Sequence, residues 1–288
     1  MSHLDKTGSE YETVRKKAGV RDTETEVLVL RGEDSLGFLN RIVTAELEGL
    51  KEGEGRRALL LTANGRVRAD LRILMSVEEL IVLMHETVVD ELHDEWEENI
   101  FIEDVEVKKP GFSVITVQGP ESRDVVSKAT GYDDLPESLH THAAIETKDG
   151  TLIRAVRSDS TGEGGYDLLV PGEELEGIHE DVLEGGAKPF GEHTHTVLRT
   201  EEGIPGFLNE LKGRIPLDAG LYEVVSFDKG CYTGQEVVAR VEQRGGGPNK
   251  ALVGLKFDSS EGVEKGGDIE HNEEFVGEVT TVVESPVL

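Results

Sequence analysis

The segment VLVLRGEDSLGFLNRIV, residues 27–43, predicts a short apolar strand, a polar turn at Gly32 and an amphipathic helix. The same order returns in SVITVQGPESRDVVSKA, residues 113–129, where Gly119 takes the place of Gly32. Pro120, directly after the second glycine, suits a first helical position. Two explanations are open, an internal duplication or the ordinary alternation of any α/β protein. The duplication predicts two related α/β halves.

Other segments predict further strands and helices. Residues 57–76 form a hairpin with an Asn64-Gly65 turn, and ELIVLMH, residues 79–85, forms the next strand. A helix follows in which three apolar residues share one face, namely Val88, Leu92 and Trp96. A second hairpin covers residues 151–171, and GGGPN, residues 245–249, is a linker. Beyond it, residues 251–258 and 274–288 predict strands of a small β module.

The length and the charge limit the class of protein. A chain of 288 residues predicts about two domains, and we divide it into regions 1–110, 111–243 and 244–288. Acidic residues number 59 against 30 basic ones, for a net charge of −29. This charge indicates either a protein adapted to a high-salt cytoplasm, from a halophilic source, or an acidic surface that recruits a basic partner. Non-specific nucleic-acid binding is disfavoured because it needs a basic surface.

The cellular compartment is predicted from three features that the sequence lacks: a signal peptide, a membrane-spanning segment and a pair of cysteines. The N-terminal stretch has no apolar signal-peptide core, and the longest apolar run is far too short to cross a membrane. One cysteine excludes an intramolecular disulfide and fits a reducing compartment. We therefore expect a cytoplasmic protein.

That single cysteine, Cys231, lies in the stretch KGCYTGQEVVAR, residues 229–240. Thr233 and Glu236 have the spacing of a capping box, so a helix should begin there. The thiol then lies near a helix N-terminus and near Lys229, and both features favour a reactive thiolate. The alternative is a small buried apolar residue. No neighbouring histidine supports a cysteine–histidine hydrolase.

Two weaker motifs are interpreted as uninformative. The triplet HTH occurs twice, and on a strand each histidine pair would share a face that could ligate a metal. Exposed polar histidines explain them as well, and we predict no metal site. GEGG, residues 162–165, lacks the lysine and hydroxyl residue of a phosphate loop.

The cysteine stretch resembles the signature of the YgfZ-like folate-binding family, which assists iron–sulfur protein maturation within the glycine-cleavage T-protein (aminomethyltransferase) superfamily. Four other segments resemble this superfamily in order: LRGEDSLGFLNRIVT (30–44), LLTANGRVRADLRIL (60–74), STGEGGYDLLVP (160–171) and LRTEEGIPGFLNEL (198–211). The resemblance implies an α+β, T-protein-like fold. Two ferredoxin-like α/β domains and a small C-terminal β-barrel, here either reduced or cut short, would surround a central folate channel.

The resemblance also implies a ligand, tetrahydrofolate or a one-carbon derivative. Glu163 would bond the pterin ring, Tyr166 would line the channel, and Arg199 would meet the negative end of the folate. Glu201 and Gln235 complete the expected binding residues. From the residues alone, a solvated acid, a strand aromatic and an ion-pair partner explain the first three equally well.

One departure bears on activity. T-proteins carry adjacent aspartates in the hairpin, whereas this chain keeps Asp70 and has Ala69 in place of the companion acid. We therefore expect an accessory factor for iron–sulfur enzyme maturation or repair, with Cys231, Lys229 and Asp70 as its reactive groups. Its partners would be folate and iron–sulfur client or assembly proteins, without nucleic acid or membrane. The alternatives are an aminomethyltransferase of the glycine cleavage system and a folate-binding protein linked to tRNA modification.

Overall fold

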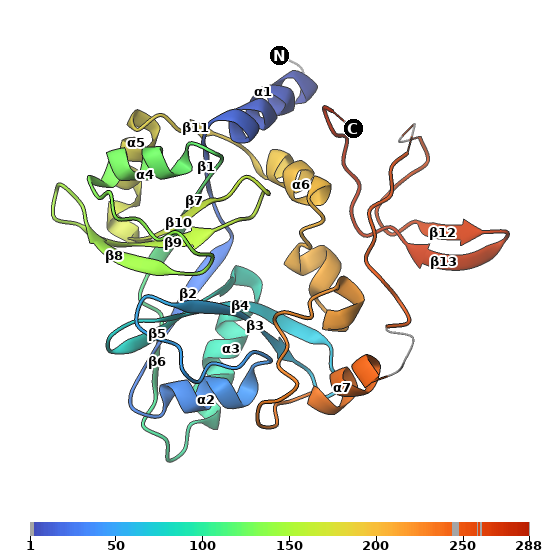
Figure 1. Cartoon of the computed structure of the whole chain (residues 1–288), viewed down its shortest axis with the longest axis horizontal. Helices are drawn as coiled ribbons and strands as arrows, with labels where there is room; N and C mark the ends of the chain where they lie inside the picture. Colours follow the sequence, from blue (N-terminus) through green and yellow to red (C-terminus); the bar gives the residue numbers. More distant parts are fainter. Residues whose placement is uncertain (1–2, 244–247, 258, 260, 288) are drawn as a thin grey trace.

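Two β-sheets form the centre of the computed structural model, which describes residues 3–243, 248–257, 259 and 261–287 (Figure 1). The first sheet has the strand order β3-β4-β5-β2-β6, and the second has the order β11-β1-β7-β10-β9-β8. The bounds in the first sheet are β2 (Thr25–Arg31), β3 (Gly55–Leu61), β4 (Val67–Met75), β5 (Glu79–His85) and β6 (Glu106–Lys108). Those in the second are β1 (Gly19–Asp22), β7 (Phe112–Gln118), β8 (His142–Glu146), β9 (Leu152–Ser158), β10 (Gly165–Pro171) and β11 (Lys188–Pro189).

The two sheets repeat one arrangement, as the duplication predicts. In each sheet, one strand is followed along the chain by a meander of three strands and pairs antiparallel with the third of them. These pairs are β2 with β5 and β7 with β10. Both β2 and β7 end at a glycine in the left-handed region, Gly32 at φ 113° and Gly119 at φ 126°. An added Cβ would lie 2.0 Å from the Asp104 oxygen at Gly32 and 2.3 Å from the Lys17 oxygen at Gly119. Close packing therefore requires glycine at both turns.

The helix after Gly119 begins two residues later than it would if Pro120 were its first residue. The helix α4 (Ser122–Thr130) begins at Ser122, so the prediction for Pro120 is wrong. Its counterpart α2 (Ser35–Ile42) begins equally far beyond Gly32. The equal spacing extends the likeness of the two halves to their turns.

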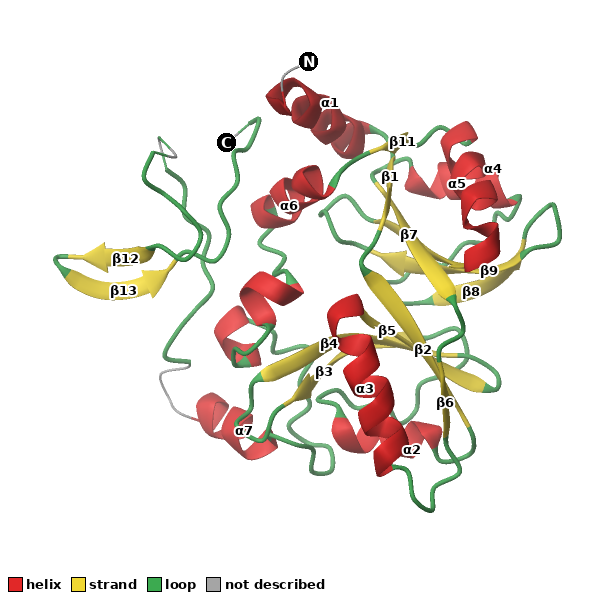
Figure 2. Ribbon diagram, turned by 180° about the vertical axis from the view of Figure 1, so that it is seen from behind, coloured by secondary structure: helices red, strands yellow, loops and turns green. Residues whose placement is uncertain are grey.

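Helices cover the outer face of each sheet (Figure 2). On the five-stranded sheet lie α2 and α3 (Glu86–Asn99), and Val88, Leu92 and Trp96 of α3 are buried there as predicted. The six-stranded sheet packs against α4 and α5 (Leu175–Glu184). Its strand β1 comes from the start of the chain, so residues 19–22 belong to the second sheet although they precede β2.

The inner faces of the sheets pack against each other through aliphatic side chains. Val27, Val29, Leu74, Ile81 and Leu83 of the first sheet meet Val114, Val156 and Leu169 of the second. Other inner-face positions carry polar side chains, among them Asp70, Arg72 and Asp167. This division places polar groups between two rigid sheets.

The rest of the chain packs around the sheets in further segments. The helices α1 (His3–Lys16) and α6 (Glu192–Glu201) share an apolar cluster. A second cluster joins the β3–β4 end of the first sheet to the segment 211–238. The remaining elements are the short 3₁₀ helices η1 (Gly172–Glu174) and η3 (Pro216–Ala219), the short π-helix η2 (Phe207–Leu211), the helix α7 (Gln235–Gln243) and the strands β12 (Asp268–His271) and β13 (Glu274–Glu278). None of the described helices is long and apolar enough to span a bilayer.

The C-terminal region differs from the expected barrel. Its described residues form one hairpin, β12 with β13, and no closed barrel (Figure 1). Residues 251–257 form no strand, so that prediction is wrong for the described part, and the second predicted strand is limited to β13. The predicted linker at 245–249 lies largely outside the described residues.

Candidate functional site

Strand alternation places charged side chains of β4 between the sheets. Ala69, Leu71 and Ile73 lie in the core beneath α2 and α3. Asp70 and Arg72 lie on the opposite face because successive strand residues alternate in direction. Ala69 therefore faces away from the side that Asp70 occupies, and an acid there would be buried among apolar residues.

Asp70 is paired with an arginine of the neighbouring strand. Arg57 donates two hydrogen bonds to the carboxylate, 2.9 Å from Nε to Oδ1 and 2.7 Å from Nη2 to Oδ2. The Arg57 and Asp70 side chains are 22% and 21% exposed. Burial lowers the pKa of Arg57, but the charge and hydrogen bonds of Asp70 outweigh it and raise that pKa overall. The pair is therefore charged, fixed in orientation and within reach of solvent.

A second pair crosses from one sheet to the other. Arg72 of β4 donates a short hydrogen bond to Oδ2 of Asp167 on β10. Oδ1 of Asp167 accepts a 3.0 Å hydrogen bond from the Ser158 hydroxyl. Gln118 continues this network by donating to Ser158 over 3.0 Å. Both oxygens of Asp167 are thus engaged.

His140 lies within electrostatic range of both pairs. Its backbone has a φ of 67°, and its amide donates to the Arg157 carbonyl over 2.9 Å. Burial, with the charges of Arg72 and Arg57, lowers the pKa of His140 to about 4. The imidazole is therefore neutral near pH 7, and its buried Nδ1 has no hydrogen-bond partner among the described residues. We call Arg57, Asp70, Arg72, His140 and Asp167 the inner-face cluster.

The predicted ligands Glu163 and Glu201 meet at a different arginine. Arg15 of α1 donates to Glu163 over 2.7 Å and also bonds Glu201. Glu202 contacts Arg15 as well, at 3.2 Å. The Glu201 side chain is 6% exposed, and the Tyr11 hydroxyl donates to it over 2.7 Å. The structure thus brings together two of the predicted residues, around a cation that was not predicted.

Tyr166 and Arg199 both lie in packed surroundings. Tyr166 belongs to the core between the second sheet and its helices, and its hydroxyl donates to the Pro136 carbonyl over 2.9 Å. Arg199 pairs with Glu210 at 3.1 Å, and these side chains are 9% and 4% exposed. Both residues therefore have protein partners in this structure.

The cysteine loop carries an exposed thiol, Cys231, ahead of α7. The helix begins at Gln235 after Gly234, whose φ is 82°, so the capping box at Thr233 does not form as predicted. Gln235 bonds back to the Lys229 carbonyl at 3.5 Å.

Lys229 fastens this loop to the segment after α2. Its ammonium donates to the carbonyls of Asn40 at 2.6 Å, Val43 at 3.0 Å and Ala45 at 2.6 Å, and to the Asn40 side-chain oxygen at 3.1 Å. Burial lowers the pKa of Lys229 to about 8, so the amine is mostly protonated at pH 7. The cation is thus held by oxygens of another segment, which points to a structural clamp.

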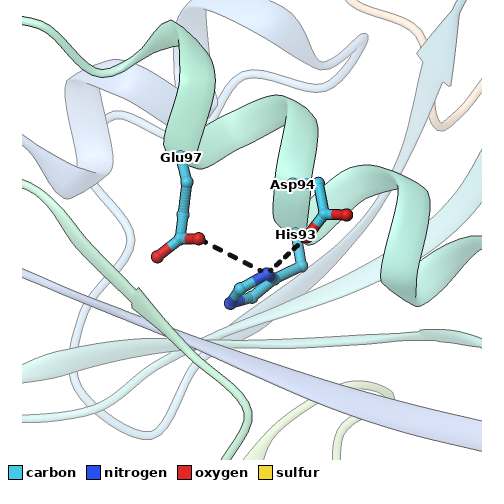
Figure 3. A group of neighbouring side chains, drawn as sticks. All are labelled: His93, Asp94 and Glu97. Carbon is cyan, nitrogen blue, oxygen red and sulfur yellow. Dashed lines mark hydrogen bonds and ion pairs between the residues drawn. The ribbon is translucent and has the colours of Figure 1, made fainter.

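The histidine motifs do not form metal sites among the described residues. His193 and His195 lie on the helix α6 rather than on a strand, so the shared strand face predicted for them is wrong. His142 begins β8, while His140 precedes that strand. The group of possible ligands that the structure does bring together is His93, Asp94 and Glu97 on α3 (Figure 3). One nitrogen, His93 Nδ1, lies 3.2 Å from a carboxylate oxygen of Asp94 and 3.7 Å from one of Glu97, and both acids are exposed.

Sequence reasoning identified one of the five residues of the inner-face cluster. Arg72 and Asp167 follow the period of their strands and could have been assigned to the inner face. Arg57 and His140 depend on contacts between distant segments and carry no local signal. Two surface hollows, on α7 and between α4 and α5, are lined by other residues than this cluster.

Comparison with known proteins gives consistent matches. The GCVT N-terminal domain family matches residues 2–229. An aminomethyltransferase of Bacillus mycoides is 31% identical over 97% of this chain and 78% of its own length. One from Thermoanaerobacter pseudethanolicus is 29% identical with the same coverage. The crystal structure of the glycine cleavage system aminomethyltransferase T from Bartonella henselae superposes with a TM-score of 0.83 at 23% identity, over 96% of this chain and 76% of that one.

Proposed function

This chain belongs to the GCVT family, and we propose that it transfers the methylene unit of an aminomethyl carrier to tetrahydrofolate bound at the inner-face cluster, with release of ammonia and the free carrier thiol. Aminomethyltransferases of this family bind tetrahydrofolate and its one-carbon derivatives. The observation that carries the proposal is the fixed, partly exposed Asp70 carboxylate between the two sheets.

The residues of the cluster fit the polar edge of a reduced pterin. Carboxylates accept hydrogen bonds from ring and amino N–H groups, and guanidinium groups donate to a ring carbonyl. The two arginines balance the two aspartates, so a neutral ring system enters without an uncompensated charge. The exposed fraction of Asp70, about one-fifth, leaves room for a ligand to reach it.

Asp70 is the group best placed for chemistry. Bound tetrahydrofolate supplies the amine nitrogen that takes up the one-carbon unit. Asp70 can hold a proton from that nitrogen or stabilise positive charge beside it, an acid–base and electrostatic role. Arg57 fixes the plane of the carboxylate through its two hydrogen bonds. The other lone pairs of Asp70 remain directed away from Arg57.

The position of Ala69 is compatible with a transferase. The missing companion acid argued against transfer chemistry, but this position faces the apolar core. Any acid there would lie on the opposite side of the strand from Asp70. Its absence therefore leaves the groups around Asp70 intact.

Turnover of a lipoyl carrier protein bearing an aminomethyl group, with tetrahydrofolate as acceptor, tests the proposal. Asp70→Asn keeps the shape of the side chain and removes its charge, so kcat should fall about 10²–10⁴-fold. Asp124→Asn, at an exposed position on α4, is the matched control and should leave kcat unchanged. Undiminished turnover in the Asp70 variant would contradict the role of Asp70, and a wild-type protein without turnover would contradict the activity.

A second candidate function is an accessory role in iron–sulfur enzyme maturation, with Cys231 as the working thiol. The specific observation in its favour is the exposure of this thiol on a loop that Lys229 holds in place. One cysteine cannot hold a cluster alone, so a partner would supply further ligands. Complementation of an iron–sulfur enzyme defect with Cys231→Ser tests this role, and full rescue by the variant would contradict it.

A further inference from the structure

His140 has three features that the packing of the sheets does not explain. Its φ of 67° lies in the left-handed region, which costs free energy for a residue other than glycine. Its side chain lies within electrostatic range of four charged groups that are already paired with one another. Its Nδ1 is buried without a partner among the described residues, although a buried polar atom normally has one.

Contacts to both sheets hold the backbone of His140 between them. The carbonyl of His140 packs against Gly55 of the first sheet, where an added Cβ would lie 2.6 Å away. Its amide donates to β9 of the second sheet, at the Arg157 carbonyl. The residue thus bridges both sheets by its backbone, and its side chain lies within electrostatic range of Asp70 and Arg57.

We propose that His140 is a further ligand-contacting residue, which forms a hydrogen bond through Nδ1 to the pterin ring held at the inner-face cluster. This inference rests on the proposed function. A neutral imidazole has one nitrogen that donates and one that accepts, and the edge of a pterin offers both complements. The ligand therefore supplies the partner that Nδ1 lacks in the free protein. The strained backbone is retained because it aims the ring at this position.

Three variants separate the polar contact from the backbone conformation. His140→Gly removes the ring and accommodates the positive φ, and His140→Asn also accommodates it while placing an amide near the position of Nδ1. Leu139→Gly is the control, because it adds the same backbone freedom at an adjacent side chain that is 54% exposed. The Kd for tetrahydrofolate is measured by calorimetry, and the thermal unfolding of each free variant is recorded.

The loss of one hydrogen bond predicts that His140→Gly binds tetrahydrofolate about tenfold more weakly, while His140→Asn stays within about threefold of wild type. Leu139→Gly should bind as wild type does, and His140→Gly should unfold at or above the wild-type temperature because strain is relieved. Binding by His140→Gly within about twofold of wild type would overturn the assignment. A folded wild-type protein that binds no tetrahydrofolate would overturn the proposed function itself, which distinguishes the two failures.

Discussion

Replacing Lys229 by methionine should destabilise the fold, because the ammonium of Lys229 holds four oxygens of the segment after α2. These are the carbonyls of Asn40, Val43 and Ala45 and the Asn40 side-chain oxygen, at 2.6–3.1 Å. Methionine keeps the length of the side chain but donates nothing. One charged hydrogen bond contributes about 1.5–3 kcal/mol, and a carbonyl left without a donor costs about 1–3 kcal/mol. Because Lys229 is only partly buried, we expect a net loss of about 2–4 kcal/mol in the free energy of unfolding.

Urea denaturation at fixed salt measures this loss. Lys51→Met is the matched control, since Lys51 is exposed and the same substitution there should change the free energy of unfolding by less than about 0.5 kcal/mol. Equal urea midpoints for the Lys229 variant and wild type would refute the clamp. The lysine would then be available for the alternative role, support of the Cys231 thiolate.

Two further predictions concern pH and backbone packing. His142 accepts a hydrogen bond from Arg154 at 2.8 Å and donates to the Met75 carbonyl at 3.0 Å, and burial with the Arg154 charge lowers its pKa to about 4. As the pH is lowered, His142 of the unfolded chain is therefore protonated near pH 6.5, whereas in the folded protein it is protonated only at about pH 4. Between these two values, the free energy of unfolding of wild type should fall by up to about 3 kcal/mol more than that of His142→Gln. Parallel dependence of the two free energies of unfolding on pH would exclude this. Gly119→Ala should cost about 2–4 kcal/mol in the free energy of unfolding, because φ is 126° and the new Cβ would meet a backbone oxygen at 2.3 Å. Gly177→Ala, in the open on α5, should stabilise the protein by about 0.5–1 kcal/mol, and calorimetric unfolding of both variants compares them.

Local patterns predicted the elements of the fold that local physics controls. The Asn64-Gly65 turn, the apolar face of α3 and the two glycines that end β2 and β7 were all identified from a few neighbouring residues. The pairing of β1 with the second sheet was not identified, because pairing between strands 93 to 99 residues apart has no signature within either strand. The closed C-terminal barrel was expected from the family resemblance, and the described C-terminal residues do not form it.

The candidate site was predicted less completely than the fold. Asp70 was identified through its motif, whereas its partner Arg57 lies on another strand and became apparent only through the register of β3 with β4. His140 was interpreted as part of a repeated triplet, and its importance lies in its φ and in its unpartnered nitrogen. Glu163, Tyr166, Arg199, Glu201 and Gln235 stay predictions as folate ligands. The cytoplasmic location and the high-salt origin also stay predictions.

The most direct test of the central claim is a crystal structure of the protein soaked with tetrahydrofolate. We predict density for the pterin ring between the two sheets, with ring nitrogens about 2.7–3.2 Å from the Asp70 carboxylate and from His140 Nδ1. Density for the ring elsewhere, for example against α7, with the inner-face cluster unchanged, would contradict the account.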